Sequence, residues 1–320
     1  MRAAPYVGIS GVVSIAQQTA LHAAAAGAGL VTPWSSQAPP PSVDRRRLLL
    51  GVKATHKTQV LDVPNKYGAD WYPVGDGIRA ALANDTGSFA DGQGTMRVAQ
   101  VYAEPESIAE DPRYLDAFVT GLVRRTTGWL THVQFDMLPW DTEPATVAGV
   151  LDSLATIGIG VLLQAHGPAM SRLGPRGCAE ALAPYAHTLT HVLFDASHGT
   201  GTRLDPAALL PFLDAAAESD TLAHVGLGVA GGLDAATLPR LEPLLIRHPD
   251  LSWDAEGRLH PERLDGSRPL NLDAAALYLR ASATLLSSTP EEPRNERVHN
   301  AVGATHVQAD PPTPNRSTTG

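Results

Sequence analysis

Short apolar segments alternate with longer Ala- and Leu-rich segments along most of this chain, and this alternation constrains the fold more than any other feature. Eight apolar segments are predicted as strands. They are rich in Leu, Val and Ile without a regular polar alternation, which is typical of strands buried on both faces. These strands cover residues 6–10, 48–54, 97–102, 131–137, 159–165, 191–196, 224–230 and 251–256.

Amphipathic segments follow the predicted strands, so the chain reads as eight strand-then-helix units. The predicted helices are residues 14–28, 77–84, 111–126, 143–157, 175–188, 205–219, 234–247 and 271–287. This pattern predicts an α/β fold, a single (β/α)8 barrel over residues 1–287. An open doubly wound sheet would carry a dinucleotide fingerprint after its first strand, and residues 8–11 do not supply one. We expect the polar segment 288–320 to be a disordered tail.

Composition narrows the class of protein. A hydrophobic fraction of 43% is ordinary for a globular chain, and a net charge of −9 argues against a general affinity for nucleic acid. The single cysteine, Cys178, excludes an intramolecular disulfide and a cysteine-built zinc site. No apolar stretch reaches the roughly 20 residues of a membrane helix, and residues 7–26 fit a strand and helix better than a signal peptide. We therefore expect a cytoplasmic protein without a membrane partner.

Polar side chains stand at the carboxyl ends of the predicted strands, where barrels place their catalytic residues. Such groups cost free energy to bury unless they meet a ligand or one another. The long segment 58–77 follows the second strand on the same face and is a candidate lid. The strand-end side chains are Ser10, Lys53, His56, Lys57, Gln100, Tyr102, Gln134, Asp136, Gln164, His166, Asp195, Ser197, His198, Asp254 and Glu256.

Two glycine-rich segments indicate a phosphate site. Gly231 and Gly232 end the seventh strand and precede a predicted helix, so that backbone N–H groups and the helix N-terminus would face an anion. After the sixth strand, further N–H and hydroxyl donors come from Gly199, Thr200, Gly201 and Thr202. Barrel phosphate sites are often built near strands seven and eight, which fits this placement.

These motifs carry a resemblance to a known family. The segments Phe194–Ser197, 199–205 and Val229–Leu233 resemble the second half of phosphoribosylanthranilate isomerase, and residues 7–11 resemble its first strand more weakly. The resemblance implies a cofactor-free Amadori rearrangement of an aminoaldose phosphate to an aminoketose phosphate. It also implies that Asp195 is the general acid. The family's catalytic cysteine base falls on Ser10 and its motif lysine on Gly8.

The sequence departs from that family at two strand ends. A serine hydroxyl is a far poorer base than a thiol, so another group must take the base role. Asp254 and Glu256 lie two residues apart on the eighth strand and would point the same way, where they can divide acid and base roles. They could also hold a metal, but no compact His/carboxylate triad accompanies them, so no metal site is predicted. His56 and His166 are further base candidates.

The sequence therefore predicts a phosphosugar isomerase-like enzyme with an altered acid/base set and no cofactor. Candidate catalytic residues are Asp195, Ser10, Lys53, His56, Asp254 and Glu256, and candidate substrate contacts are Lys57, Gln134, Asp136, Gln164 and His166. Two alternatives stay open: a lyase or aldolase working through a Schiff base on Lys53, and a non-catalytic barrel that binds phosphorylated metabolites. A homodimer is compatible with the sequence.

Overall fold

The structure is a computed structural model. It describes residues 2–31, 46–83, 95–103, 105–111, 113–126, 128–136, 144–197 and 203–288. The predicted tail lies outside these residues except for Ser288, which ends the last helix.

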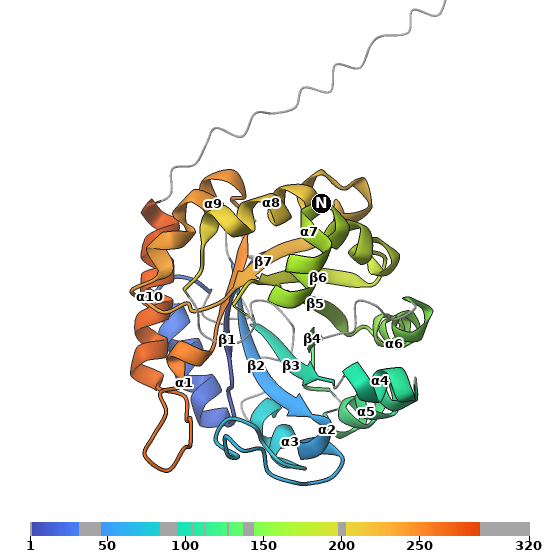
Figure 1. Cartoon of the computed structure of the whole chain (residues 1–320). Coiled ribbons are helices and arrows are strands. Elements are labelled where there is room, and N and C mark those ends of the chain that lie inside the picture. Colours follow the sequence, from blue (N-terminus) through green and yellow to red (C-terminus); the bar gives the residue numbers. More distant parts are fainter. Residues whose placement is uncertain are drawn as a thin grey trace, which may run out of the picture. The chain divides into compact units, whose positions relative to one another are not determined.

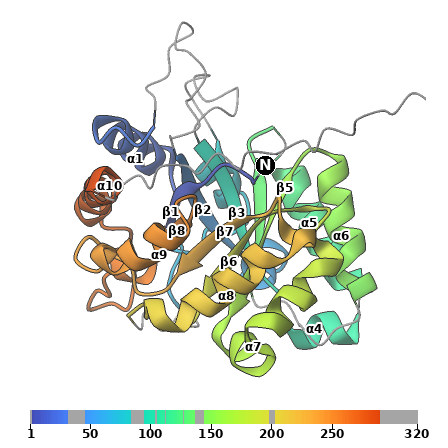
Figure 2. The same ribbon diagram turned by 90° about the horizontal axis from the view of Figure 1, so that it is seen from above.

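Eight parallel strands close into a barrel in chain order, because each strand pairs with the next and the last pairs with the first (Figures 1 and 2). This confirms the predicted fold class. The strands are β1 (Tyr6–Ser10), β2 (Arg47–Thr55), β3 (Thr95–Tyr102), β4 (His132–Asp136), β5 (Gly160–His166), β6 (Leu189–Asp195), β7 (Gly226–Ala230) and β8 (Ser252–Ala255).

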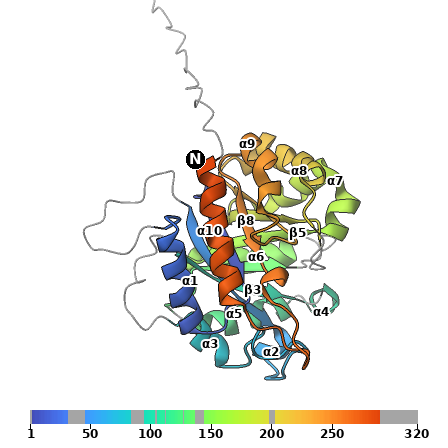
Figure 3. The same cartoon turned by 90° about the vertical axis from the view of Figure 1, so that its left-hand side faces the viewer.

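Helices surround the barrel, and the first and last of them lie side by side where the ring closes (Figure 3). The α-helices are α1 (Ile15–Gly27), α2 (His56–Gln59), α3 (Gly77–Leu82), α4 (Pro105–Glu110), α5 (Arg113–Arg125), α6 (Pro144–Thr156), α7 (Gly167–Leu182), α8 (Pro206–Glu218), α9 (Glu242–Arg247) and α10 (Leu272–Ser288). Short 3-10 helices are η1 (Ala183–Tyr185), η2 (Asp220–Leu222), η3 (Leu238–Leu241) and η4 (Gly257–Leu259). Within the described residues, none of these helices is long and apolar enough to cross a membrane.

Local sequence sets several helix boundaries. Asp205 caps α8 by accepting the N–H of Ala207, with Pro206 at the first helical position. The prediction for α7 was wrong at its start, because the helix begins at Gly167 instead of residue 175. Gly174 has φ 66° and interrupts the helix just before Pro175, so the sequence pattern marks only the second of two segments.

Apolar residues fill two regions of the core. The larger region lies between the strands and the surrounding helices, and a small inner cluster fills part of the barrel. The inner cluster consists of Tyr6, Leu49, Met96, Val98 and Leu162. Inward-facing residues alternate along each strand, so the same faces that carry this cluster also carry the polar strand ends.

Two buried histidines complete the amino-terminal end of the barrel interior. A Cβ on Gly160 would lie 2.3 Å from the His132 ring, and one on Gly226 would lie 2.3 Å from the His191 ring. The rings therefore take the space that these glycines leave. Burial lowers the pKa of His132 to about 3 and that of His191 to about 4, with nearby positive charge adding to the effect.

This histidine layer makes the barrel sensitive to acid. Below about pH 6.5 the unfolded chain binds a proton at His191, whereas the folded chain does not bind it until the pH approaches about 4. The free energy of unfolding therefore decreases as the pH falls from about 6.5 towards about 4. We expect His191→Gln to remove this loss. Denaturant unfolding at pH 7 and pH 5 should show the wild type losing about 2 kcal/mol more than the variant. Parallel pH dependences of the two proteins would contradict the expectation.

Candidate active site

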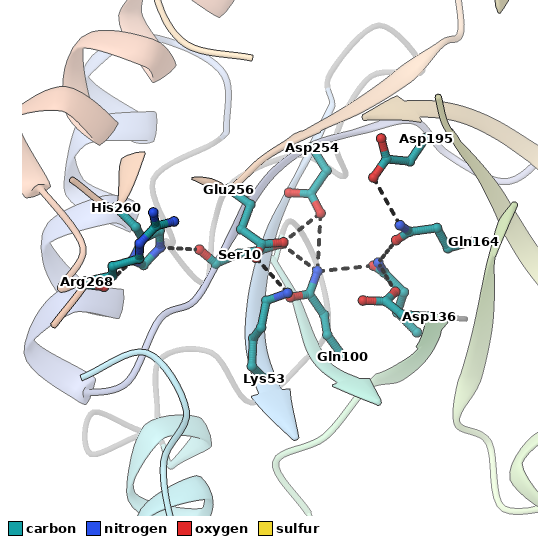
Figure 4. A network of polar contacts seen from close by, with 11 residues as sticks. Ser10, Lys53, Gln100, Asp136, Gln164, Asp195, Asp254, Glu256, His260 and Arg268 are labelled. Carbon is teal, nitrogen blue, oxygen red and sulfur yellow. Dashed lines mark hydrogen bonds and ion pairs between the residues drawn. The ribbon is translucent and has the colours of Figure 1, made fainter. Parts of the chain in front are cut away.

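The carboxyl ends of β1, β3 and β8 bring three polar side chains together in the barrel (Figure 4). The Ser10 hydroxyl donates to Asp254 Oδ2 at 2.8 Å. Gln100 Nε2 lies 2.5 Å from Ser10 Oγ and 3.3 Å from the same Asp254 oxygen. All three residues are at most 5% exposed. The serine in the predicted base position therefore has a carboxylate beside it, which sequence reasoning did not find.

A row of amides continues this network around the barrel. Gln100 Nε2 reaches Gln134 Oε1 at 3.4 Å, and Gln134 Nε2 donates to Gln164 Oε1 at 3.0 Å. Gln164 Nε2 then donates to Asp195 Oδ2 at 3.2 Å. The hydrogen bonds thus connect Asp254 on β8 with Asp195 on β6, two of the acidic residues that sequence analysis singled out (Figure 4).

Donors on both oxygens hold the Asp195 carboxylate. Oδ1 accepts from the backbone N–H of Ser197 at 2.9 Å and from its hydroxyl at 2.6 Å, while Oδ2 accepts from Gln164. Gly231 comes so close that a Cβ there would lie 3.1 Å from Asp195 Oδ1. The β6 carboxylate and the glycine pair after β7 are therefore neighbours.

Lys53 and Glu256 form a second part of the cluster. Their side chains pair at 2.6 Å, with 11% and 32% of the lysine and glutamate side chains exposed. Burial alone lowers the pKa of Lys53, but Glu256, Tyr72 and Asp136 outweigh it, so the pKa is raised above its ordinary value. Lys53 is a fixed positive charge in this environment. Arg258, two residues after Glu256, pairs instead with Asp234 at 3.0 Å.

Two carboxyl groups of the cluster have pKa values well above the ordinary value of an aspartate. Burial raises the pKa of Asp254 to about 7, because it outweighs the hydrogen bond from Ser10. Burial likewise raises the pKa of Asp136 to about 6, against the opposing charge of Lys53 and a 3.0 Å hydrogen bond from Gln134. Carboxyl groups with pKa values near neutrality can both give and take protons, which is what acid/base catalysis requires.

Missing side chains on β1 and β2 make room for this cluster. A Cβ on Gly8 would lie 2.7 Å from Asp254 Oδ1, and one on Gly51 would lie 2.9 Å from Gln100 Cδ. Gly8 is the position where the resembling family carries lysine. A lysine at position 8 would collide with Asp254, so the carboxylate at this place on β8 requires glycine at position 8.

Other predicted site residues are placed differently. The His56 ring packs 4.7 Å from the Tyr114 ring and 5.9 Å from the Phe118 ring, towards α5, and Lys57 is exposed on α2. Neither is joined to the polar network by a described hydrogen bond. His166 ends β5 and pairs in register with Asp195, so it borders the site.

The candidate phosphate segments are only partly described. Gly231 and Gly232 follow β7 with φ values of 117° and 56°, which favour glycine. The predicted helix at 234–247 was wrong at its start. Asp234 Oδ1 accepts the N–H groups of Ala236 and Thr237 in a turn, and helical structure begins only with η3 and continues into α9. The segment Gly199, Thr200, Gly201 and Thr202 lies outside the described residues.

The two loops after β2 and β8 pack against each other beside the cluster. Trp71 stacks on His260 with the ring centroids 5.1 Å apart, and the Arg268 guanidinium lies 5.4 Å from the Trp71 centroid. Sequence analysis named the loop after β2 as segment 58–77 but missed His260 and Arg268. They follow the last strand in a segment without helical or strand periodicity, so no pattern marked them.

The described residues contain no group of three His, Cys, Asp or Glu side chains that could hold a metal ion. The closed sheet and the polar residues at its carboxyl end define a (β/α)8 barrel with a polar cluster at the usual site position.

Comparison with solved structures finds several proteins that are similar to this chain. The tryptophan synthase alpha chain of Legionella pneumophila subsp. pneumophila matches with a TM-score of 0.50 at 13% identity, over 90% of this chain and 94% of that one. A chitinase catalytic domain from Pyrococcus furiosus matches with a TM-score of 0.48 at 11% identity, over 91% of this chain and 99% of that one. A 3-hexulose-6-phosphate synthase matches with a TM-score of 0.44 at 15% identity, over 86% of this chain and 99% of that one.

The likeness to the tryptophan synthase alpha chain shows the fold alone, because proteins this dissimilar in sequence share barrels with unrelated functions. No protein-family model and no curated protein sequence match the chain. The resemblance to phosphoribosylanthranilate isomerase therefore rests on the motifs around Asp195 and Gly231.

Proposed function

We propose that this protein is a cofactor-independent acid/base enzyme that isomerises a phosphorylated aminoaldose-like substrate. The observation that carries the proposal is the Ser10–Asp254 hydrogen bond at the position of the family's base. The carboxyl group of Asp254, with a pKa near 7, supplies the proton acceptor that a serine lacks.

In this proposal Asp195 gives a proton to the ring oxygen as the C1–O bond breaks, which opens the substrate to its iminium form. Asp254 then takes the proton from C2 to give the enaminol. Asp254 returns that proton to C1 while the proton of the C2 hydroxyl passes back to Asp195, so that the aminoketose forms and both carboxyl groups are restored. The intervening amides of Gln100, Gln134 and Gln164 hold the two carboxyl groups in one connected frame. Lys53 supplies a positive charge for an anionic part of the substrate.

The phosphate group would bind at Gly231 and Gly232, next to Asp195, together with the segment 199–202. Because Asp234 occupies the nearest N–H groups of the following turn, helix potential contributes little there. Backbone N–H groups of the glycine pair are the donors that this proposal uses.

A thermal-shift titration tests the ligand class. The ligands are ribose 5-phosphate, a phosphoribosyl-amine analogue, their dephosphorylated counterparts and inorganic phosphate. At about 100 times Kd, binding adds roughly 2.7 kcal/mol, which raises the midpoint by degrees. We expect stabilisation by the phosphorylated sugars only. No shift with any ligand would remove the basis for a phosphosugar enzyme.

A matched pair of variants localises the phosphate. Gly231→Ala places a Cβ 3.1 Å from Asp195 and Ser197 atoms, whereas Gly266→Ala also changes a positive-φ glycine but meets nothing within 4 Å. We expect Gly231→Ala to abolish the phosphate-dependent shift and Gly266→Ala to retain it. Equal retention by both would place the phosphate elsewhere.

The Schiff-base alternative makes a separate prediction. An imine needs a neutral amine, and the pairing with Glu256 stabilises the Lys53 ammonium. We expect borohydride, added with aldose or ketose phosphates, to leave the protein mass unchanged. A reduced adduct that disappears in Lys53→Met would favour the lyase or aldolase reading instead.

A further inference from the structure

Gln134 on β4 is the junction of the amide row. The residue is 1% exposed, and its Nε2 donates to Asp136 Oδ1 at 3.0 Å and to Gln164 Oε1 at 3.0 Å. Its Oε1 accepts from Gln100 Nε2 at 3.4 Å. An amide has two N–H groups and one carbonyl oxygen, so the whole hydrogen-bonding capacity of Gln134 is directed at the cluster.

The carboxylates along the row fix the direction of its hydrogen bonds. A carboxylate oxygen without a proton only accepts, so Asp195 Oδ2 faces the N–H end of Gln164. For the same reason Asp136 faces the N–H end of Gln134. Gln134 then presents its oxygen to Gln100, which meets it with Nε2. The constraints from Asp195 and from Asp136 therefore agree on one orientation for every amide.

The Gln100 amide passes this direction on to Ser10. Gln100 Nε2 lies 2.5 Å from Ser10 Oγ, 3.3 Å from Asp254 Oδ2 and 3.4 Å from Gln134 Oε1. One N–H therefore serves Ser10, and the other is shared between Asp254 and Gln134. Because Ser10 accepts from Gln100, its single proton is directed at Asp254 Oδ2, at 2.8 Å.

This orientation of the Gln100 amide depends on its neighbours. Its Oε1 is buried and meets no hydrogen-bond donor among the described residues, so the carbonyl end does not hold the amide in place. Ionised Asp254 requires a donor and keeps Nε2 towards it. Protonated Asp254 could instead donate to a turned amide, and then Gln134 is the neighbour that opposes the turn.

We propose that Gln134 is a positioning residue, which keeps the Gln100 amide and the Ser10 hydroxyl as hydrogen-bond donors to Asp254 in both protonation states of that carboxyl group. Without Gln134, protonated Asp254 would donate to the turned Gln100 amide and hold its proton more tightly. In the proposed reaction Asp254 takes a proton and returns it, so tighter holding slows the return. This catalytic consequence rests on the proposed function, whereas the orientation of the amides does not.

Carbon-13 NMR of labelled aspartate side chains measures the pKa of Asp254, and Asp254→Asn identifies its signal by removing it. We expect a midpoint near pH 7 in the wild type and about one pH unit higher in Gln134→Met. The variant gives the protonated form an acceptor and takes fixed donors from the ionised form, and both effects raise the pKa. A midpoint that is unchanged or lower would overturn the proposal.

Other charges do not produce this rise. Glu256 and Asp136 raise the pKa of Asp254, and Lys53 lowers it. Gln134→Met also removes the hydrogen bond that lowers the pKa of Asp136, so Asp136 becomes less charged and would lower the pKa of Asp254. The remaining titratable groups that act on Asp254 are the buried phenols of Tyr6 and Tyr278, whose pKa values lie well above the ordinary value.

The same substitution outside the cluster is the matched control. Gln18 on α1 is 5% exposed, and its Nε2 donates to the carbonyl oxygen of Ala81. Gln18→Met also removes a buried amide, and its Asp254 midpoint should equal that of the wild type. An equal rise in both variants would show that any loss of a buried amide produces it, against the proposal.

The wild-type protein provides a test that does not depend on the folding of a variant. Nuclear Overhauser contacts between the Gln100 side-chain N–H groups and the Ser10 β-protons should persist at pH 8 and at pH 6, on either side of the Asp254 midpoint. Loss of these contacts at pH 6 would show that the amide turns when Asp254 is protonated, and the proposal would be wrong.

Turnover supplies an independent readout. If the proposed reaction holds, Gln134→Met should lower kcat about tenfold at little change in KM and move the acidic limb of the pH profile to higher pH. A protein without the proposed activity would still show the NMR behaviour. Failure of the proposed function and failure of this inference are therefore distinguishable.

Discussion

Asp254→Asn should lower turnover of aminoaldose phosphates by about 10³-fold or more, because it removes the group that exchanges the substrate proton. Asparagine has the same shape, and its carbonyl oxygen can still accept from the Ser10 hydroxyl at the position of Oδ2. Affinity for the phosphorylated ligand should therefore stay within about tenfold. Steady-state kinetics and ligand titration measure the two quantities, and unchanged kcat would refute the role of Asp254.

The same variant separates catalysis from stability. The folded chain binds a proton at Asp254 up to about pH 7, whereas the unfolded chain releases it near pH 4, so this stabilising contribution is lost as the pH rises from about 4 to about 7. The full difference is of the order of 4 kcal/mol. Denaturant unfolding at pH 5 and pH 8 should show the wild type losing more stability than Asp254→Asn. A larger loss in the variant would contradict the raised pKa.

Asp195→Asn should also abolish turnover while leaving the affinity for phosphorylated ligands within about tenfold. Its carboxylate accepts three hydrogen bonds, and an amide can keep those from Ser197 through its carbonyl oxygen. The variant loses the ionisable carboxyl group but keeps a side chain of the same shape in the same position. Turnover in Asp195→Asn equal to that of the wild type would remove Asp195 from the mechanism.

A control aspartate lies on the outside of the barrel. Asp214 on α8 pairs with Arg247 at 3.1 Å and with His248 at 3.0 Å. Asp214→Asn removes a charge without touching the cluster, so its kcat should equal that of the wild type. A comparable loss in this variant would show that the effect of Asp195→Asn comes from charge or stability alone.

Much of the fold followed from local pattern. Buried parallel strands need continuous apolar runs, so segments such as Tyr6–Ser10 could be located without any knowledge of their neighbours. The same logic placed Asp195, Asp254 and Gln134 at the carboxyl ends of strands. Helix starts were less predictable where side chains take the N–H groups, as Asp234 does.

The sequence by itself determined which residues reach the carboxyl-terminal end of the barrel, because strand period and strand order depend on the pattern of apolar residues. Only the tertiary structure decided which of them touch. Ser10 and Asp254 are 244 residues apart, and Ser10 and His260 are 250 apart, so their pairing depends on closure of β8 against β1. Gly8 leaves room for Asp254 and Gly11 leaves room for His260, because a Cβ at these positions would lie 2.7 Å from Asp254 Oδ1 and 2.4 Å from His260 Nε2. These contacts exist only in the folded barrel, so the sequence alone does not reveal them.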